Sequence, residues 1–368
     1  MKWYFMIGFL LVATIMIVAG HIALYASWLT FFGIHSLKIK WALRIILAIL
    51  SMSFIITSLL TYWRENTFVN ALYGGSGGWL GMAWYLSLAV ALTWIIYFIG
   101  RWFGVKIPLA IIASACMAMG LAYSVYGIRN AQHPVIKRVT LTIPNLPQAW
   151  KGRTAVQLSD VHLGPVHREK FLQRVVDQVK SLNPDAVFVT GDLFDGGGRD
   201  LDKLAEPLNQ LNPPLGMYYI TGNHETYIGL DQALAALENI HMKKLHDQMV
   251  IAAGMQIVGI DYPKMGEKKD LAAIMSHTDP LQPSIVLWHE PNHLDELKRL
   301  GANVVLSGHT HVGQIWPFNY ITQAVYGAND YGLQTDGDFS QYTSSGVGTW
   351  GPPMRTGNRP EIVVIKFE

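Results

Sequence analysis

Cysteine is nearly absent from this sequence. The chain of 368 residues has a single cysteine, Cys116, and its neighbours in the sequence are apolar. One thiol cannot build a disulfide framework. A thiol within an apolar segment also cannot act as a nucleophile in the polar part of the chain. Both a disulfide-stapled fold and a cysteine-dependent enzyme are therefore excluded.

Acidic residues are nearly absent from the first third of the chain. Residues 1–130 contain eight lysines and arginines but a single acid, Glu65. A bilayer core of about 30 Å is crossed by about 20 apolar residues in a helix. Four stretches meet that length, with tryptophan and tyrosine near their ends as in interfacial belts: residues 3–30, 41–63, 79–100 and 107–127.

These stretches predict an all-α transmembrane bundle of about four helices over residues 1–130. The chain is then expected to be a multi-pass membrane protein, with the lipid bilayer as a partner. A separate water-exposed domain is expected over residues 131–368.

The glycine-rich run at residues 74–78 lacks the features of a phosphate-binding loop. No Lys-Ser or Lys-Thr pair follows it, and no strand precedes it. We expect a flexible loop between the second and third spans.

Basic residues are not in excess in the remainder of the chain. Residues 131–368 contain 20 basic and 25 acidic side chains, a net charge of −5. Binding to a phosphate backbone needs clustered lysine and arginine. No nucleic-acid partner is therefore expected.

Short β-branched runs alternate with polar, helix-like stretches after residue 131. Such alternation, with nearly continuous apolar strands, predicts an α/β layered fold with a buried and largely parallel sheet. The tail from residue 315 onward is rich in glycine and is expected to form antiparallel strands. The predicted strands cover residues 153–158, 186–190, 217–221, 257–260, 284–288, 303–307 and 361–367.

Five of these strands end in polar residues that can bind metal. In an open α/β sheet, ligands bind at the carboxyl ends of the strands, so these residues are expected to converge. Each motif alone has an ordinary structural interpretation, such as a turn or a buried histidine, whereas their combination points to one site. The motifs are Asp160-Val161-His162, Gly191-Asp192 with Asp195, Gly222-Asn223-His224-Glu225, His289, and Gly308-His309-Thr310-His311.

The order of these motifs resembles the calcineurin-like metallophosphoesterase superfamily. The resemblance covers about residues 153–368. The stretches 307–314 and 345–355 are similar to the bacterial membrane-associated branch, which includes relatives of UDP-diacylglucosamine hydrolases and general phosphodiesterases. The resemblance to this superfamily and branch implies a four-layer α/β/β/α metallophosphoesterase sandwich and a location in a bacterial cytoplasmic membrane.

The resemblance also implies a ligand set for two divalent metal ions. One ion would bind Asp160, His162, Asp192 and His311, and the other Asp192, Asn223, His289 and His309, with Asp192 shared by both. His224 would be the catalytic acid, oriented by Asp195.

Paired cations suit phosphoester hydrolysis because they generate a hydroxide nucleophile near neutral pH and neutralise charge at phosphorus. Carboxylate, amide and imidazole ligands together suit Mn, Fe or Zn, and the residues do not select among these metals. Four further histidines, His167, His246, His277 and His293, lie on polar segments and are expected to be solvated. His167 follows the first motif closely, and lining the pocket is its alternative role.

One position departs from the protein-phosphatase branch of the superfamily. Gly196 stands where that branch has arginine, directly after Asp195. An arginine there would grip a dianionic monoester, so its absence favours phosphodiesters. Arg355 is open to two interpretations, a substitute for that arginine or a surface salt bridge.

The leading interpretation is a membrane-anchored phosphodiesterase or pyrophosphatase, with a lipid-linked phosphoester as one candidate substrate. A non-catalytic metal-binding scaffold on the same fold and a metal-dependent nuclease are the alternatives. Lysine and arginine number five on each side of the predicted bundle. When Lys137 and Arg138 are assigned to the first strand of the folded domain, the count favours a catalytic domain outside the cytoplasm. The oligomeric state cannot be deduced from these patterns.

Overall fold

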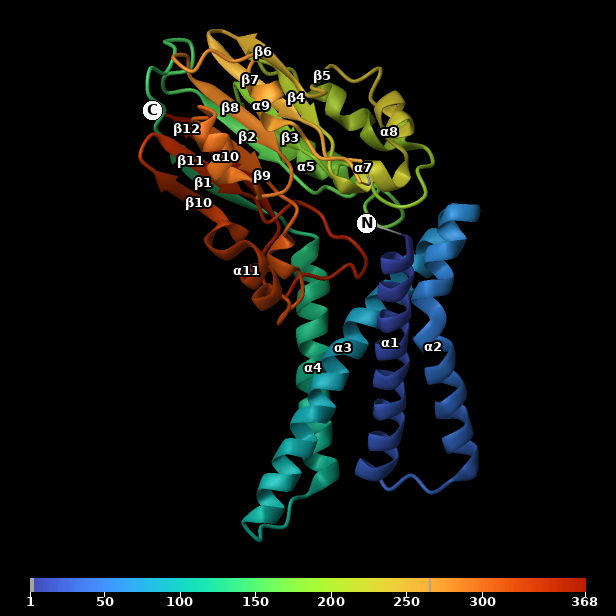
Figure 1. Cartoon of the computed structure of the whole chain (residues 1–368). Helices are drawn as coiled ribbons and strands as arrows, with labels where there is room; N and C mark the ends of the chain where they lie inside the picture. Colours follow the sequence, from blue (N-terminus) through green and yellow to red (C-terminus); the bar gives the residue numbers. More distant parts are fainter. Residues whose placement is uncertain (1–2, 265) are drawn as a thin grey trace. The chain divides into compact units, whose positions relative to one another are not determined.

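The computed structural model describes residues 3–264 and 266–368 (Figure 1). The chain divides into two compact units. One, the helical unit, consists of Met1–Arg129 together with Gly351–Thr356. The other, the sheet unit, consists of Asn130–Trp350 and Gly357–Glu368.

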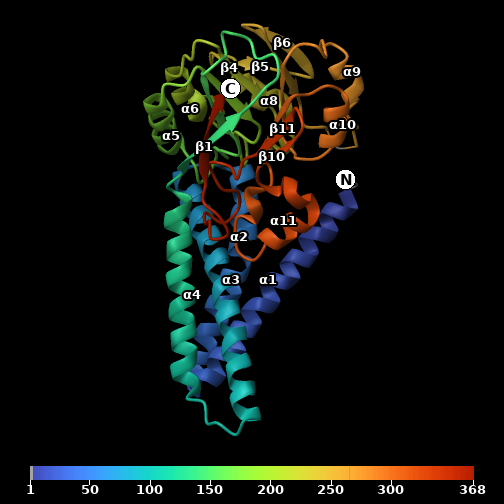
Figure 2. The same ribbon diagram turned by 90° about the vertical axis from the view of Figure 1, so that its left-hand side faces the viewer.

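The helical unit contains four long apolar helices, as predicted. Each is long and apolar enough to cross a membrane. The connections α1–α2 and α3–α4 lie at the same end of this unit (Figures 1 and 2). The helices are α1 (Trp3–Phe31), α2 (Leu37–Trp63), α3 (Thr67–Trp102) and α4 (Leu109–Ala131).

Side chains from all four helices share one apolar cluster, which includes Leu24, Leu47, Leu86 and Ala113. Polar side chains add contacts between helices. The Trp79 indole donates to Nε2 of His21 at 3.0 Å, while Nδ1 of His21 donates to the Ile17 carbonyl at 2.8 Å. One ring nitrogen that donates and one that accepts is the pattern of a neutral imidazole.

The prediction of a loop at residues 74–78 is wrong, because these residues lie inside α3. The helix starts earlier because Asn66 caps it, accepting from the Val69 amide at 3.0 Å. Glycine is tolerated in membrane helices, where it lets other groups approach closely. Gly77 uses this freedom, since a Cβ there would come within 3.2 Å of Pro353 and 3.3 Å of Phe54.

The sheet unit is built on two six-stranded sheets. The first has the order β1 (Val135–Leu141), β12 (Glu361–Phe367), β2 (Thr154–Leu158), β3 (Ala186–Thr190), β4 (Met217–Ile220) and β5 (Lys243–Lys244). The second has the order β10 (Gly332–Asp336), β11 (Phe339–Thr343), β9 (Val304–Ser307), β8 (Ser284–Trp288), β7 (Met255–Ile260) and β6 (Gln248–Ala252).

The alternation of side chains along each strand fills three apolar layers. On β3, Val187 and Val189 face the helices α5 (Glu169–Leu182), α6 (Leu201–Ala205) and α8 (Leu230–Ala236). Phe188 points the other way, into the core between the sheets. The outer face of the second sheet packs on α9 (Leu271–Met275) and α10 (Leu294–Arg299). The predicted four-layer α/β/β/α sandwich is therefore confirmed.

The tail differs from the expected run of antiparallel strands. It contains a helix, α11 (Asn319–Tyr326), before β10. Strand β11 is antiparallel to β10 but parallel to β9. Strand β12 is parallel to β1 and antiparallel to β2. The mixture of parallel and antiparallel strand pairs depends on contacts between residues far apart in the sequence, which a local sequence pattern does not predict.

Arg355 does not form a surface salt bridge. Its side chain is fully buried within the helical unit, and its amide donates to the Gly127 carbonyl of α4 at 2.9 Å. The surface interpretation is therefore wrong.

Candidate metal centre

The predicted ligands follow the carboxyl ends of five strands of the sheet unit. Asp160, Asp192 and Asn223 follow β2, β3 and β4 of the first sheet. His289 follows β8, and His309 and His311 follow β9, in the second sheet. The ends of β3 and β8 are joined directly, because Nδ1 of His289 donates to the Thr190 carbonyl at 2.8 Å.

Asp160, His162 and His311 form one group of potential ligands. Their ligand atoms lie within 4.8 Å of one another, and all three residues are buried. The Nε2 atoms of His162 and His311 are 2.9 Å apart. Oδ1 of Asp160 lies 3.3 Å from Nε2 of His311. Two imidazole nitrogens and a carboxylate oxygen that converge in this way can share a cation.

Asp192, His289 and His309 form a second group. Oδ2 of Asp192 lies 3.3 Å from Nε2 of His289. The amide oxygen of Asn223 joins them, at 3.2 Å from His289 Nε2 and 2.8 Å from His309 Nδ1. The hydrogen bond between His289 and the Thr190 carbonyl fixes the ring so that Nε2 faces this group.

Asp192 lies between the two groups. Its Oδ1 accepts from the His224 amide at 2.8 Å. Its Oδ2 is 3.3 Å from His289 in the second group and 3.9 Å from His162 in the first. A single carboxylate oxygen therefore faces ligands of both groups, which is the arrangement that a shared ligand requires.

His224 and Asp195 lie beside these groups. Nδ1 of His224 is 3.0 Å from Oδ1 of Asp195, and its Nε2 is 4.0 Å from Asp192. Burial disfavours the charged form of His224. The charge of Asp192 and the hydrogen bond to Asp195 outweigh burial and raise the pKa of His224 to about 9. The ring can therefore carry a proton near neutral pH.

Two of the candidate histidine ligands, His309 and His162, have protonation states that suit metal binding. Burial, together with the charge of His289, lowers the pKa of His309 to about 4. Burial likewise holds the pKa of His162 well below its usual range, with the charges of His224 and His311 adding to the effect. Both rings are then neutral, as a ligand must be.

His289 behaves differently. Burial opposes its protonation, but the charge of Asp192 and the hydrogen bond to it raise the pKa of His289 to about 10. A metal that binds there must displace this proton, so binding is expected to be coupled to pH. Together the two groups offer imidazole, amide and carboxylate donors, and one carboxylate, that of Asp192, lies between them. Such a donor set fits two divalent cations.

The ligand loops adopt backbone conformations that are rare for residues with a side chain. Asp160, His162, Asp192, His309 and His311 all have φ between 48° and 73°. Such strain is typical of functional sites, where the surrounding structure holds it. Gly191 has φ of 90°, and a Cβ there would clash with His289. A Cβ at Gly222 would clash with the Asp192 carboxylate.

Glu225 is a residue whose role the sequence analysis missed. Its fully buried carboxylate accepts from the amides of Asp192 and Phe194 at 3.0 Å and of Gly222 at 2.7 Å. It thus holds together the loops that carry Asp192 and Asn223. Its position within the Gly-Asn-His-Glu motif was the available signal.

Tyr262 was also not foreseen as part of the site region. The planes of the Tyr262 and His309 rings are inclined by 29°, with centroids 6.2 Å apart. Tyr262 follows β7, which carries none of the five predicted motifs. The expectation that His167 is solvated is wrong, because its side chain is buried and its Nε2 accepts from the Thr349 amide at 3.0 Å.

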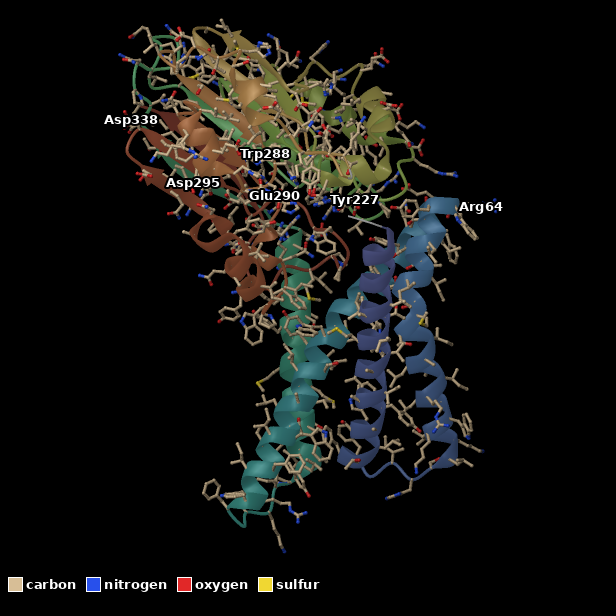
Figure 3. All side chains as sticks on the ribbon, viewed as in Figure 1. Arg64, Tyr227, Trp288, Glu290, Asp295 and Asp338 are labelled. Carbon is tan, nitrogen blue, oxygen red and sulfur yellow. The ribbon has the colours of Figure 1, made fainter. Side chains whose placement is uncertain are left out.

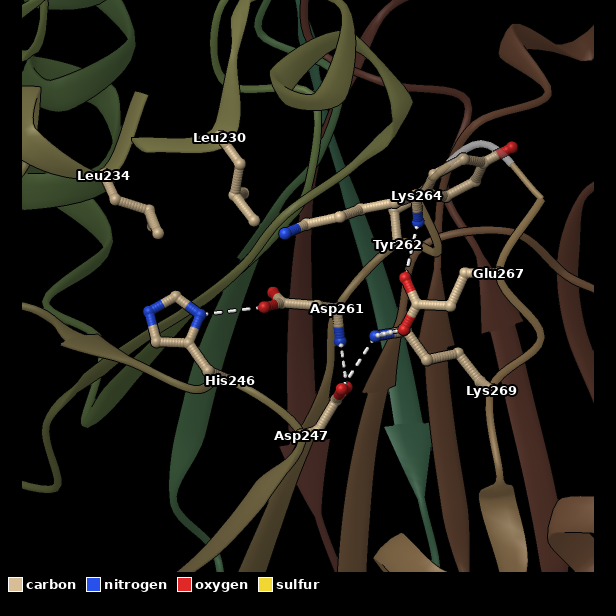
Figure 4. A pocket seen from close by; sticks show the side chains of 9 residues that line it. All are labelled: Leu230, Leu234, His246, Asp247, Asp261, Tyr262, Lys264, Glu267 and Lys269. Carbon is tan, nitrogen blue, oxygen red and sulfur yellow. Dashed lines mark hydrogen bonds and ion pairs between the residues drawn. The ribbon is translucent and has the colours of Figure 1, made fainter. Parts of the chain in front are cut away.

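A cavity of about 390 Å³ lies beside Tyr262 (Figure 4). Its wall includes Leu230 and Leu234 of α8. His246, whose Nδ1 is 2.8 Å from Oδ2 of Asp261, also lines the cavity. Glu290, just beyond β8, and Tyr227 are labelled in Figure 3, and neither is among the residues that line the cavity. The cavity therefore has both apolar and charged walls, and its link to the candidate metal groups is Tyr262, whose ring lies 6.2 Å from that of His309 between centroids.

Comparisons with known proteins agree with this geometry. The profile of the family described as calcineurin-like phosphoesterase matches residues 154–313. An uncharacterized metallophosphoesterase of Campylobacter jejuni is 32% identical, over 79% of this chain and 83% of that protein. A metallophosphoesterase of Aquifex aeolicus, also uncharacterized, is 33% identical over 63% of this chain and 91% of its own length.

A transmembrane protein with metallophosphoesterase domain from Danio rerio is 34% identical over 70% of this chain. The alignment covers 61% of that relative's length. Among solved structures, a dimetal phosphatase from Danio rerio aligns with 59% of this chain at 15% identity and a TM-score of 0.39. The candidate ligands up to His311 fall inside the region that the family profile matches. The chain belongs to the calcineurin-like phosphoesterase family.

Proposed function

We propose that this chain is a membrane-anchored phosphodiesterase or pyrophosphatase with a dinuclear metal site. The position of Asp192 carries the proposal, because its Oδ2 faces candidate ligands of both groups, His289 and His162. Two divalent cations held by these groups would neutralise charge at phosphorus and activate water for in-line attack.

The protein's own residues have separate tasks in this proposal. Asp195 holds the imidazole of His224 in place through the hydrogen bond at Nδ1. The other ring nitrogen, Nε2, can then give a proton to the leaving oxygen. Glu225 keeps the loops of Asp192 and Asn223 in register.

A lipid-linked phosphoester is our candidate substrate. Supporting it are the four apolar helices and the short connection between α4, which ends at Ala131, and β1, which begins at Val135. The cavity beside Tyr262 is large enough to take a polar portion of such a substrate.

Hydrolysis of an aryl phosphodiester by the purified chain tests the proposal. We expect activity that disappears on exhaustive chelation and returns when Mn²⁺ or Zn²⁺ is added back. Full activity after chelation would contradict the dinuclear mechanism. Metal binding without any hydrolysis would favour the non-catalytic scaffold instead.

A further inference from the structure

The segment around α11 exposes more apolar side chains than a water-facing surface ordinarily does. Within ten residues the large exposed side chains are Trp316, Phe318, Tyr320, Ile321 and Val325, which we call the α11 face. Tyr320, Ile321 and Val325 are 61%, 59% and 67% exposed. Contiguous apolar surface of this kind marks a site that contacts another apolar phase.

Helix α11 is amphipathic, with a polar side that faces the sheet unit and an apolar side that faces away from it. Thr322 and Tyr326, one turn apart, form its inner side. Thr322 donates to the Asp330 carboxylate at 3.1 Å, and Tyr326 donates to Glu290 at 3.0 Å. Ile321 and Val325, also one turn apart, lie on the outer side, which no other part of the sheet unit covers.

The composition of the segment fits the interfacial region of a bilayer. Residues 316–328 contain no charged side chain. Tryptophan, tyrosine and phenylalanine, each present on the α11 face, are favoured where the acyl chains meet the headgroups. Helices that lie in this region bury their apolar side about 5–10 Å into it. An uncharged segment would bind there through apolar area and not through anionic lipids.

Hydrogen bonds near the start of this segment involve a residue that adjoins the helical unit in the sequence. The side-chain amide of Gln314 donates to the Trp350 carbonyl at 3.0 Å and accepts from the Trp350 amide at 3.1 Å. Trp350 is covalently followed by Gly351, the first residue of Gly351–Thr356 in the helical unit. Gln314, which precedes the α11 face by two residues, is therefore hydrogen-bonded to the residue that comes directly before Gly351–Thr356.

We propose that the α11 face is an interfacial membrane anchor, seated in the headgroup and acyl-chain boundary of the bilayer that the chain's own helices cross. The proposal rests on those helices spanning a membrane and not on hydrolytic activity. It has a consequence for the site, since the Tyr326 ring stands edge-on to His309, with centroids 6.2 Å apart. An anchored α11 would hold the loop of His309 at the level of lipid headgroups.

The test uses the full chain in nanodiscs of phosphatidylcholine. A Cys116→Ala background removes the single natural thiol, which is buried in α4. Ile321→Cys and Val325→Cys then carry an environment-sensitive fluorophore. Ile251→Cys and Leu281→Cys are matched controls, because these apolar residues of the sheet unit are 66% and 80% exposed but lie far from α11 in the sequence.

We expect the label at positions 321 and 325 to lose fluorescence when brominated acyl chains replace ordinary ones, and to resist quenching by aqueous iodide. The labels at 251 and 281 should show the opposite pattern. Iodide quenching at 321 and 325 as strong as in the controls would overturn the proposal. Protection from both quenchers would also overturn it, since a protein, such as a second copy of this chain, would then cover the face. The readout needs no substrate, so an inactive enzyme would leave it intact.

Discussion

Nδ1 of His224 lies 3.0 Å from Oδ1 of Asp195, while the amide of the same histidine donates to Asp192 at 2.8 Å. The histidine is thus fixed at both its backbone and its ring, next to the carboxylate that faces both candidate metal groups. Only Nε2 is left to exchange a proton with a substrate. This arrangement separates the task of holding metal from the task of moving a proton.

His224→Ala should therefore lower kcat on an aryl phosphodiester by roughly 10²–10⁴-fold, the usual range for loss of a general acid. Metal content should stay at the level of the unchanged protein, because His224 is not among the metal ligands that the family resemblance implies, although its ring lies with His162 and Asp195 in a further group of potential ligands. Elemental analysis of the purified variant, together with its kcat, checks both statements.

Asp192→Ala is the matched comparison. This carboxylate faces His289 and His162, so its removal should reduce the metal content as well as the activity. Unchanged metal content per chain would show that the shared-ligand assignment is wrong. A large loss of metal in His224→Ala would instead assign a ligand role to His224.

Glu225→Gln should destabilise the sheet unit. The buried carboxylate accepts from the three backbone amides of Asp192, Phe194 and Gly222. An amide group would turn a donor toward one of these N–H groups and leave it without an acceptor. Such a loss costs about 1–3 kcal/mol of unfolding free energy.

A lower Tm and weaker metal retention during dialysis are the expected measurements. Glu238→Gln is the control, since Glu238 is exposed and its replacement should change neither quantity. A Tm equal to that of the control variant would mean that the three hydrogen bonds contribute little.

The strand ends were the part of the site that could be predicted from the sequence. Asp160, Asp192 and His289 each follow a short apolar strand, and parallel strands bring such residues to one edge. Glu225 could not be assigned, because its partners are backbone amides whose position depends on how two loops fold. Local sequence does not encode that geometry.

Helix α11 was missed for a different reason. Its inner side carries the polar Thr322 and Tyr326, and its outer side carries Ile321 and Val325. This is the reverse of the pattern by which a helix on a water-soluble domain is recognised. A similar difficulty affected residues 74–78, because glycine ends helices in water but is common within helices in lipid.

A preference for phosphodiesters over phosphomonoesters follows from Gly196. Its φ is 81°, and a Cβ there would clash with Pro165, so the loop is built around the absence of a side chain. A hydrogen bond to a charged oxygen contributes about 1.5–3 kcal/mol. Without an arginine at this position, we expect kcat/KM for the diester to exceed that for the monoester by roughly tenfold. The measurement compares two esters with the same aryl leaving group, and a higher value for the monoester would contradict the expectation.

The remaining prediction concerns which side of the membrane carries the sheet unit. The ends of the helical unit that bear the α1–α2 and α3–α4 connections are basic. Around these connections lie Lys38, Lys40, Arg44, Arg101 and Lys106. At the opposite helix ends lie Arg64, offset by Glu65 and labelled in Figure 3, and Arg129. Lys2, which precedes α1 in the sequence, is counted with them. Lys137 and Arg138 belong to β1 of the sheet unit and are not counted with the helix ends.

Short loops rich in lysine and arginine stay in the cytoplasm. The α1–α2 and α3–α4 connections are therefore expected to be cytoplasmic. The end of α4, which leads into the sheet unit, then lies on the other side. We predict that alkaline phosphatase fused after Glu368 is active and that a fluorescent protein unable to fold after export is dark at the same position. Fusions after Phe103, in the α3–α4 connection, provide the internal control and should give the opposite pair of signals. An inactive alkaline phosphatase and a bright fluorescent protein at Glu368 would place the metal site in the cytoplasm. The candidate substrates would then be cytosolic nucleotides and inner-leaflet lipids.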